Sequence, residues 1–374
     1  MKSFYRFFGI ETLVELKDSL YKDQLIKDFK IYKVDEIVSK KEVLKLTDNW
    51  SEFEQTFLSR NPSIHYYNQN VFFIDEKLIK IAFVFNEEKK LKSIFFELKY
   101  AKNSFRRGLR KWLNMQFTNR IENVGQILHE QVLVPLTFFC ENKVPIHASA
   151  VTRNDKTILF GGTGGVGKTS IELELCLNGM YGFAADDIAI GDIEGTIYSN
   201  YNSPKIYGYN AEGNSILKKI VFQNQGLFSK IHWNFHKTIF GLAKVRRKIA
   251  PNSLFKNVSP EKTIFSHYLM LFRSYGNEIA VTELSKEKAS EMSVAVILAE
   301  YAYFMNHIKW HQFNALGNGV EPILTVDMLK GRWEKNMNQL LDKIAINQIN
   351  IPIRINHNQF KSEIGEIIKR ITKN

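Results

Sequence analysis

A glycine-rich segment near the middle of the chain constrains the fold more than any other feature. Residues Gly162–Thr169 read Gly-Thr-Gly-Gly-Val-Gly-Lys-Thr, which fits the Walker A pattern G-x-x-x-x-G-K-[S/T]. The apolar residues Thr157–Phe160 precede it, and a helical pattern from Lys168 to Asn178 follows and stops at Gly179, the residue type expected just past a helix end. A loop of this kind between a strand and a helix predicts an α/β fold that binds phosphate.

Each part of this motif has a role in binding a nucleoside triphosphate. Glycines let backbone N–H groups close around phosphate oxygens, Lys168 reaches the β and γ phosphates, and the Thr169 hydroxyl reaches Mg²⁺. A flexible glycine-rich turn is the alternative, but it does not explain a Lys-Thr pair at the start of a helix. We therefore expect ATP and Mg²⁺ as cofactors. The expected nucleotide-binding residues are Gly162, Thr163, Gly164, Gly165, Val166, Gly167, Lys168, Thr169 and Ser170.

Two adjacent carboxylates, Asp186 and Asp187, follow the apolar residues Gly182–Ala185. Asp186 lies 18 residues after Lys168, which leaves room for one helix, one turn and one strand. Ordinary P-loop ATPases and GTPases more often place this carboxylate much further along the chain. One acid can hold Mg²⁺ while the other accepts a proton from an attacking hydroxyl or water. The alternative is a solvated turn, where Asp is common.

The segment Pro145–Asp187 resembles the catalytic domain of the HPr kinase/phosphorylase family and its relatives in peptide-modifying gene clusters. The shared pieces are His147-Ala-Ser-Ala-Val151, Ile158-Leu-Phe-Gly-Gly-Thr-Gly-Gly-Val-Gly-Lys-Thr169 and Ala185-Asp186-Asp187, in that order. The resemblance implies a mixed α/β fold like that of phosphoenolpyruvate carboxykinase, in place of the common doubly wound P-loop sheet. It also implies phosphorylation of a serine hydroxyl on a protein or peptide.

The resemblance also assigns site roles. Asp186 would be the catalytic base for the acceptor hydroxyl, and Asp187 would join Thr169 as a magnesium ligand. His147 would lie beside the phosphate loop and assist Asp186 or the transferring phosphoryl group, on which Lys168 also acts. The alternative for His147 is a core histidine on a strand.

Two departures separate the chain from HPr kinases themselves. HPr kinases carry an acid directly after the phosphate-loop hydroxyl residue, where this chain has Ser170, with Glu172 and Glu174 further along the helix. The downstream basic-acidic-Arg-Gly signature is not found either. We therefore do not expect HPr as substrate or a phosphorylase activity. The closer likeness is to the kinases of ribosomal-peptide pathways, which include those that phosphorylate a lasso-peptide precursor.

These observations predict an ATP-dependent serine kinase whose partner is a peptide or protein acceptor. One alternative is a kinase of a small hydroxylated molecule such as free serine. The other is a nucleotide-gated module that binds a peptide without modifying it, which Ser170 keeps open.

The hydrophobic pattern indicates three regions. An N-terminal mixed α/β region is expected at 1–115, a P-loop catalytic domain at 116–330 and a C-terminal extension at 331–374. The expected elements are helices at Glu11–Asp28, Ile121–Glu141 (with a kink or boundary at Pro135) and Lys286–Met305, a hairpin of Val71–Ile74 and Leu78–Val84, and strands at Pro145–Thr152 and Tyr181–Ile190.

The formal net charge of +12 either attracts polyanions or reflects an AT-rich coding sequence, since the Lys residues are scattered along the chain. The cluster Lys244-Val-Arg-Arg-Lys248 could clamp a phosphate or steer an acidic acceptor, or form a solvated loop. No nucleic-acid-reading module accompanies it, so nucleic acid is not expected as a partner.

Two cysteines without metal spacing, Cys140 and Cys176, fit a reducing compartment. The start of the chain has no clean signal-peptide core, and no apolar run approaches the ~18 residues that span a bilayer. We therefore expect a cytoplasmic protein without a membrane partner. A homo-oligomer is compatible with the sequence.

Two histidine pairs have helical spacing, His232 with His236 and His307 with His311. Each pair would share one helix face and could hold a metal. No third ligand stands near either pair in the sequence, and the interleaved aromatic residues favour packing instead.

Overall fold

The computed structural model describes residues 2–35, 43–54, 56–99, 123–212, 214–223 and 226–372. These residues form a mixed α/β protein with two compact units. Of the described residues, unit 1 holds those up to 99 with 123–141 and 298–333, and unit 2 holds 142–297 and 334–372. The expected boundary between residues 115 and 116 lies outside the described residues. The division into catalytic domain and extension stays a prediction.

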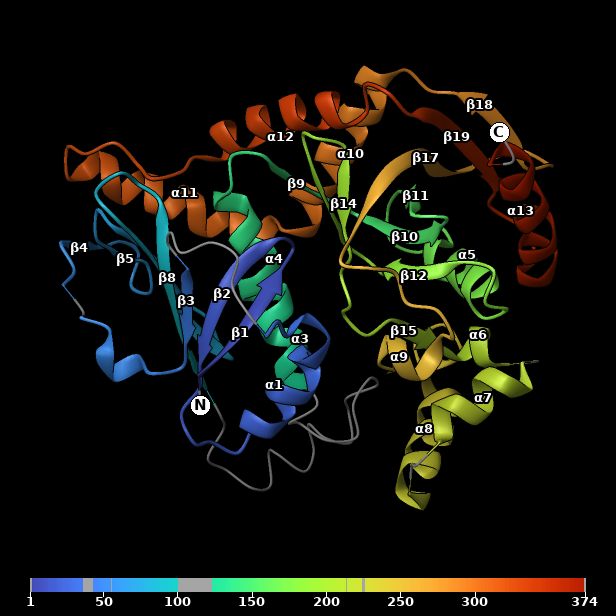
Figure 1. Cartoon of the computed structure of the whole chain (residues 1–374), viewed down its shortest axis with the longest axis horizontal. Coiled ribbons are helices and arrows are strands. Elements are labelled where there is room, and N and C mark those ends of the chain that lie inside the picture. Colours follow the sequence, from blue (N-terminus) through green and yellow to red (C-terminus); the bar gives the residue numbers. More distant parts are fainter. Residues whose placement is uncertain are drawn as a thin grey trace. The chain divides into compact units, whose positions relative to one another are not determined.

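Unit 1 is built on a six-stranded sheet in the order β1-β2-β3-β8-β7-β6 (Figure 1). The hairpin predicted over residues 71–84 is confirmed as the antiparallel pair β6–β7. The helix expected over Glu11–Asp28 is wrong in its first half. Thr12 and Val14 are β-branched and buried, with the half-buried Leu13 between them, so this segment has the alternating burial of a strand. The strands are β1 (Lys2–Phe7), β2 (Ile10–Glu15), β3 (Leu44–Thr47), β6 (Val71–Asp75), β7 (Ile79–Phe85) and β8 (Leu91–Leu98), with a separate short pair, β4 (Ser59–Arg60) and β5 (Tyr66–Tyr67).

The helical segments of unit 1 are shorter than expected. In the described part of the helix expected over Ile121–Glu141, a π-helical turn at His129–Leu133 separates α3 (Val124–Leu128) from α4 (Val134–Leu136), and a 3-10 turn follows at Thr137–Phe139. Pro135 lies in α4 and cannot donate a backbone hydrogen bond, which fits an interrupted helix at this point. The other helices of this unit are α1 (Lys22–Phe29) and α11 (Ala302–Gly317).

Unit 2 is built on a larger sheet in the order β12-β10-β11-β17-β14-β13-β9, and β17 also pairs with β19, which pairs with β18 (Figure 1). The strand β11 runs antiparallel to β10 and parallel to β17. The strands are β9 (Lys143–Ile146), β10 (Ala148–Arg153), β11 (Lys156–Gly161), β12 (Gly182–Ala185), β13 (Ala189–Asp192), β14 (Thr196–Tyr198), β17 (Lys262–Ser274), β18 (Ala280–Glu283) and β19 (Ala345–Pro352), with a separate pair, β15 (Lys205–Tyr207) and β16 (Arg246–Lys248).

Two helices pack on this sheet and position the glycine-rich loop. Ile171 of α5 and Phe360 of α13 belong to one core cluster with Phe160 of β11 and Leu271 of β17. The helices with residues in this unit are α5 (Lys168–Cys176), α6 (Gly208–Ala211), α7 (Ser215–Phe222), α8 (Leu227–Phe240), α9 (Pro251–Leu254), α10 (Lys286–Glu300), α12 (Val326–Leu340) and α13 (His357–Ile371). In the described part of the chain, no helix is long and apolar enough to cross a membrane.

Three expected elements are split in the structure. The strand expected over Pro145–Thr152 breaks at His147 into β9 and β10, which lie at different positions in the sheet. The strand expected over Tyr181–Ile190 breaks after Ala185 into β12 and β13. The helix expected over Lys286–Met305 breaks at Tyr301, between α10 and α11. The first two breaks place side chains of interest between strands.

Candidate functional site

The glycine-rich loop connects the end of β11 to the start of α5, as the motif predicts. Gly162, Gly165 and Gly167 have φ values of 135°, 78° and 116°, a region that side chains other than glycine disfavour. A Cβ atom on Gly162 would lie 2.6 Å from the carbonyl oxygen of Leu271, and one on Gly167 would lie 2.6 Å from the Phe360 ring. These two positions therefore require glycine both for backbone conformation and for space.

The middle of the loop is open. Thr163, Gly164 and Gly165 are exposed, and a Cβ atom on Gly164 or Gly165 would meet no described atom within 4 Å. Val166, in contrast, is buried in the core beneath the loop. The exposed residues leave room for an anion against the backbone of the loop.

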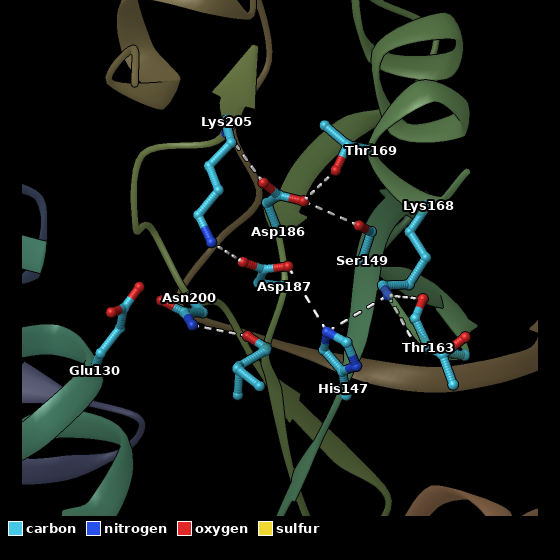
Figure 2. A network of polar contacts seen from close by, with 12 residues as sticks. Glu130, His147, Ser149, Thr163, Lys168, Thr169, Asp186, Asp187, Asn200 and Lys205 are labelled. Atoms are coloured by element: carbon cyan, nitrogen blue, oxygen red, sulfur yellow. Dashed lines mark hydrogen bonds and ion pairs between the residues drawn. The ribbon is translucent and has the colours of Figure 1, made fainter. Parts of the chain in front are cut away.

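Lys168 is buried and folds back over the loop (Figure 2). Its Nζ donates to the carbonyl oxygens of Gly162 and Thr163, each at 2.9 Å, and lies 3.5 Å from Nε2 of His147. The ammonium group is therefore held at the loop, on the side that also carries His147. The break between β9 and β10 brings His147 to this place.

Asp186 is 4% exposed and accepts hydrogen bonds from three groups. The Thr169 hydroxyl donates to Oδ1 at 2.9 Å and the Ser149 hydroxyl donates to Oδ1 at 3.2 Å. The backbone N–H of Lys205 donates to Oδ2 at 3.2 Å. Burial and the adjacent charge of Asp187 raise the pKa of Asp186 above its ordinary value, against the opposing effects of Lys205 and Thr169.

Asp187 faces a different set of groups (Figure 2). Its Oδ1 lies 3.7 Å from Nε2 of His147, and its Oδ2 lies 2.5 Å from Nζ of Lys205. Burial acts to raise the pKa of Asp187, but His147 and Lys205 together hold it well below its ordinary value. With a φ of 69°, Asp187 adopts a conformation that Asp tolerates better than most residues. This turn directs the two adjacent carboxylates to different partners.

The structure thus brings together Lys168, Thr169, Asp186, Asp187 and His147. The predicted ligand Thr169 contacts Asp186, while the predicted ligand Asp187 contacts His147 and Lys205.

The side chain of Ser170 turns away from this group. Its hydroxyl is buried and donates to Oδ1 of Asn210 on α6 at 3.1 Å. Its hydroxyl is therefore not among the groups gathered around Thr169, and its part in nucleotide binding stays a prediction.

Three residues of the site were not predicted from the sequence. Ser149 lies in the His147–Val151 segment, where alternation along a strand could have indicated that it points the same way as His147. Lys205 belongs to a segment whose sequence gave no clear pattern, so no local signal could have found it. Glu172 follows Thr169 by three residues on α5, a spacing that shares a helix face.

Glu172 is completely buried, and within the described residues neither of its carboxylate oxygens has a hydrogen-bond partner. Burial raises the pKa of Glu172 well above its ordinary value, and the charge of Asp186 raises it further, while the nearby Ser149 hydroxyl opposes the rise. Glu172 is therefore a third carboxyl group close enough to Asp186 to feel its charge, and its buried surroundings favour the neutral form.

The histidine pairs lie outside this group of residues. The rings of His232 and His236 are 4.3 Å apart, and Nδ1 of His232 is 2.9 Å from Nη2 of Arg247. His307 contacts His65 and Glu76 in unit 1. Among the described residues there is no group of three or more His, Cys, Asp or Glu arranged to hold a metal.

The basic cluster at Lys244–Lys248 is in large part a strand. Its residues Arg246–Lys248 form β16, which pairs with β15, and Arg247 is buried. The solvated loop considered from the sequence is therefore wrong for this stretch.

A scan against protein-family models finds none that matches this chain, and a search of curated proteins finds no significant match. The resemblance to HPr kinases therefore stays a prediction that depends on the residues described above.

Proposed function

We propose that this chain is an ATP- and Mg²⁺-dependent kinase that transfers the γ-phosphoryl group to a serine hydroxyl of a peptide or protein. The proposal depends mainly on three contacts at the phosphate loop. Lys168 contacts His147, and Thr169 donates a hydrogen bond to Asp186. His147 in turn contacts Asp187. An HPr-kinase-like or phosphoenolpyruvate-carboxykinase-like fold is part of this proposal. It is supported by the antiparallel pairing of β10 with β11, because a doubly wound parallel sheet would place parallel strands on both sides of the loop strand.

The donor set around Thr169 fits Mg²⁺ bound to a nucleotide. Mg²⁺ takes oxygen ligands, keeps several waters and uses only one or two carboxylates beside substrate phosphates. Since the Thr169 hydroxyl gives its hydrogen to Asp186, its oxygen lone pairs are directed elsewhere and can face a cation. Asp187, whose low pKa keeps it ionised, supplies the carboxylate. The bound ion would neutralise charge on the phosphates.

The chain's own residues would act mainly by positioning and by charge. Loop N–H groups and Lys168 hold the phosphates, and the raised pKa of Asp186 makes it the better proton acceptor of the two adjacent acids. As the acceptor oxygen bonds to the γ phosphorus, the bond from that phosphorus to the β-phosphate oxygen breaks. The acceptor proton passes to Asp186, which Ser149 and Lys205 hold in place.

Two substitutions test this proposal. We expect Lys168→Ala to weaken Mg-ATP binding at least about tenfold, because a charged hydrogen-bond donor is lost. We expect Asp186→Asn to bind Mg-ATP but to transfer phosphate about 10²- to 10⁴-fold more slowly. Calorimetry measures binding, and mass spectrometry of candidate peptides and of serine-type metabolites measures transfer. Asp155→Asn, in the exposed turn between β10 and β11, is the matched control and should behave as wild type.

The outcomes separate the candidate functions. A phosphopeptide supports the proposal, a phosphorylated metabolite supports the small-molecule kinase, and ATP bound without product supports the binding module.

Asp187 is more exposed than Asp186, with 39% of its side chain accessible. If Asp187→Asn abolishes transfer and Asp186→Asn instead needs a higher Mg²⁺ concentration for the same rate, the roles of the two acids are exchanged.

A further inference from the structure

One continuous segment of unit 2 contains basic residues and no acidic ones. Between Glu212 and Glu261 the sequence has nine Lys or Arg and no Asp or Glu. This segment forms α7, α8, β16 and α9. Negatively charged groups of a partner would therefore meet no like charge from the side chains of this segment.

The helix α8 presents a row of exposed apolar side chains. Residues four apart lie on the same face of a helix, and the opposite face is buried through His232, Trp233 and His236. Surfaces of monomeric proteins seldom expose large contiguous apolar patches, and those that do are often interaction sites. The exposed fractions are 75% for Leu227, 50% for Ile231, 40% for Phe235 and 56% for Ile239.

A recess of about 420 Å³ lies between α7 and α8. Phe222 is the apolar residue of its lining, and Lys218, Lys219 and Lys230 supply three positive charges. A concave site with an apolar group and several lysines fits an apolar side chain flanked by carboxylates. A flat lipid surface would leave such a recess unfilled, which favours a peptide over a membrane.

The same segment is joined to the proposed catalytic carboxylates. The strand β16 follows α8 and pairs with β15, whose Lys205 contacts both Asp186 and Asp187. Within unit 2, α7 and α8 lie side by side (Figure 1). In the sequence both helices fall between β15 and β16. A partner that docks on α7 and α8 is thus held on the unit that carries the phosphate loop.

We propose that the α7–α8 surface, formed by the apolar row of α8 and the lysine-lined recess, binds an acidic amphipathic helical segment of the phosphate acceptor. The acceptor's apolar face would cover the row of α8, and its carboxylates would pair with Lys218, Lys219 and Lys230. This assignment rests on the proposed kinase function for the identity of the partner. The charge and shape of the surface do not depend on it.

Fluorescence anisotropy with the full chain tests the surface. The probe is a labelled synthetic helical peptide of about 18 residues with Leu on one face and Glu on the other. The comparison probe carries Lys in place of Glu. We expect the Glu peptide to bind with an affinity that falls with salt and the Lys peptide not to bind.

Two double variants remove the two properties of the surface separately. We expect Ile231→Ser with Ile239→Ser, and Lys218→Glu with Lys219→Glu, each to weaken binding of the Glu peptide at least about tenfold. The matched controls are Leu316→Ser on α11 and Lys288→Glu on α10, both exposed, which should bind as wild type does. All substituted positions are exposed, so the variants should keep the melting temperature of wild type.

Three results would overturn the assignment: equal binding of the Glu peptide by wild type and both double variants, no binding at all, or binding only to vesicles containing phosphatidylserine or to duplex DNA. Mg-ATP binding is measured on the same samples. If wild type binds the Glu peptide through this surface but not Mg-ATP, the kinase proposal fails and the docking surface stands.

Discussion

Adjacent residues of this chain differ chemically because their surroundings differ. Asp186 and Asp187 are neighbours in sequence, yet the pKa of the first is raised and that of the second is lowered. The positive φ of Asp187 turns its carboxylate towards His147 and Lys205, while Asp186 stays buried beside Thr169. A pair of titratable groups with pKa values moved in opposite directions is characteristic of acid–base sites.

Glu172 gives a prediction for stability at the residue scale. Its folded-state pKa is raised above the ordinary 4.5, so the folded state binds this proton more tightly than the unfolded state does. The stabilisation is fully present below pH 4.5 and is lost as pH rises towards the folded-state pKa. We expect Glu172→Gln to remove this loss, so that between pH 5 and 8 the variant gains more than about 1 kcal/mol relative to wild type.

Urea unfolding at several pH values measures this difference. Glu174→Gln is the matched control, because Glu174 is exposed on the same helix. Identical pH profiles for wild type and Glu172→Gln would show that Glu172 carries no such penalty.

At the scale of elements, the glycine-rich loop depends on how tightly β17 packs beside it. Gly162→Ala combines a φ of 135° with a Cβ only 2.6 Å from the Leu271 carbonyl oxygen. We expect it to lower the free energy of unfolding by about 1–3 kcal/mol. Gly164→Ala has a normal φ and open space around it, so it should leave stability within about 0.5 kcal/mol. Thermal unfolding of both variants checks this, and equal losses would contradict it.

The elements that could be predicted from the sequence are those with local signals. The strand, loop and helix from Lys156 to Cys176 follow from the motif, and the β6–β7 hairpin follows from alternating apolar residues. The break at His147 could not be predicted this way, because apolar residues continue on both sides of it. It arises from pairing, since β9 joins β13 while β10 joins β11.

The candidate site shows the same limit. The phosphate loop and the Asp pair have recognisable spacing, so the sequence identifies them. Lys205 reaches the Asp pair through the fold, from a region rich in Asn, Gly and Pro without clear periodicity. Glu172 was visible in the sequence, but its complete burial depends on how α5 packs on the sheet.

At the scale of the whole molecule, the positive charge is concentrated. Outside the segment between Glu212 and Glu261, the chain has 42 Lys or Arg against 39 Asp or Glu. The excess of +12 is therefore largely a property of the α7–α9 segment. An AT-rich coding sequence alone does not account for a stretch without acidic residues, and the acidic partner proposed for the α7–α8 surface would account for it.

Unit 1 gives a whole-molecule prediction for acid sensitivity. The ring of His311 contacts the rings of Tyr67 and Phe72, and burial lowers the pKa of His311 to about 4 from 6.5. A depressed folded-state pKa means that the stabilisation is present above pH 6.5 and is lost as pH falls through the folded-state pKa near 4. Protonation would place an uncompensated charge among aromatic rings, so unit 1 should lose stability in this range.

We expect His311→Leu to reduce this acid sensitivity. Leu keeps the apolar contacts and gives up only a 3.4 Å hydrogen bond from the backbone N–H of Ile323, so at pH 7.5 its stability should stay within about 1 kcal/mol of wild type. Between pH 7 and 5 the variant should lose about 2 kcal/mol less than wild type. Urea unfolding at both pH values measures the difference. Phe313→Leu, exposed on the same helix, should keep the wild-type pH profile, and an unchanged profile for His311→Leu would assign the acid sensitivity to other groups.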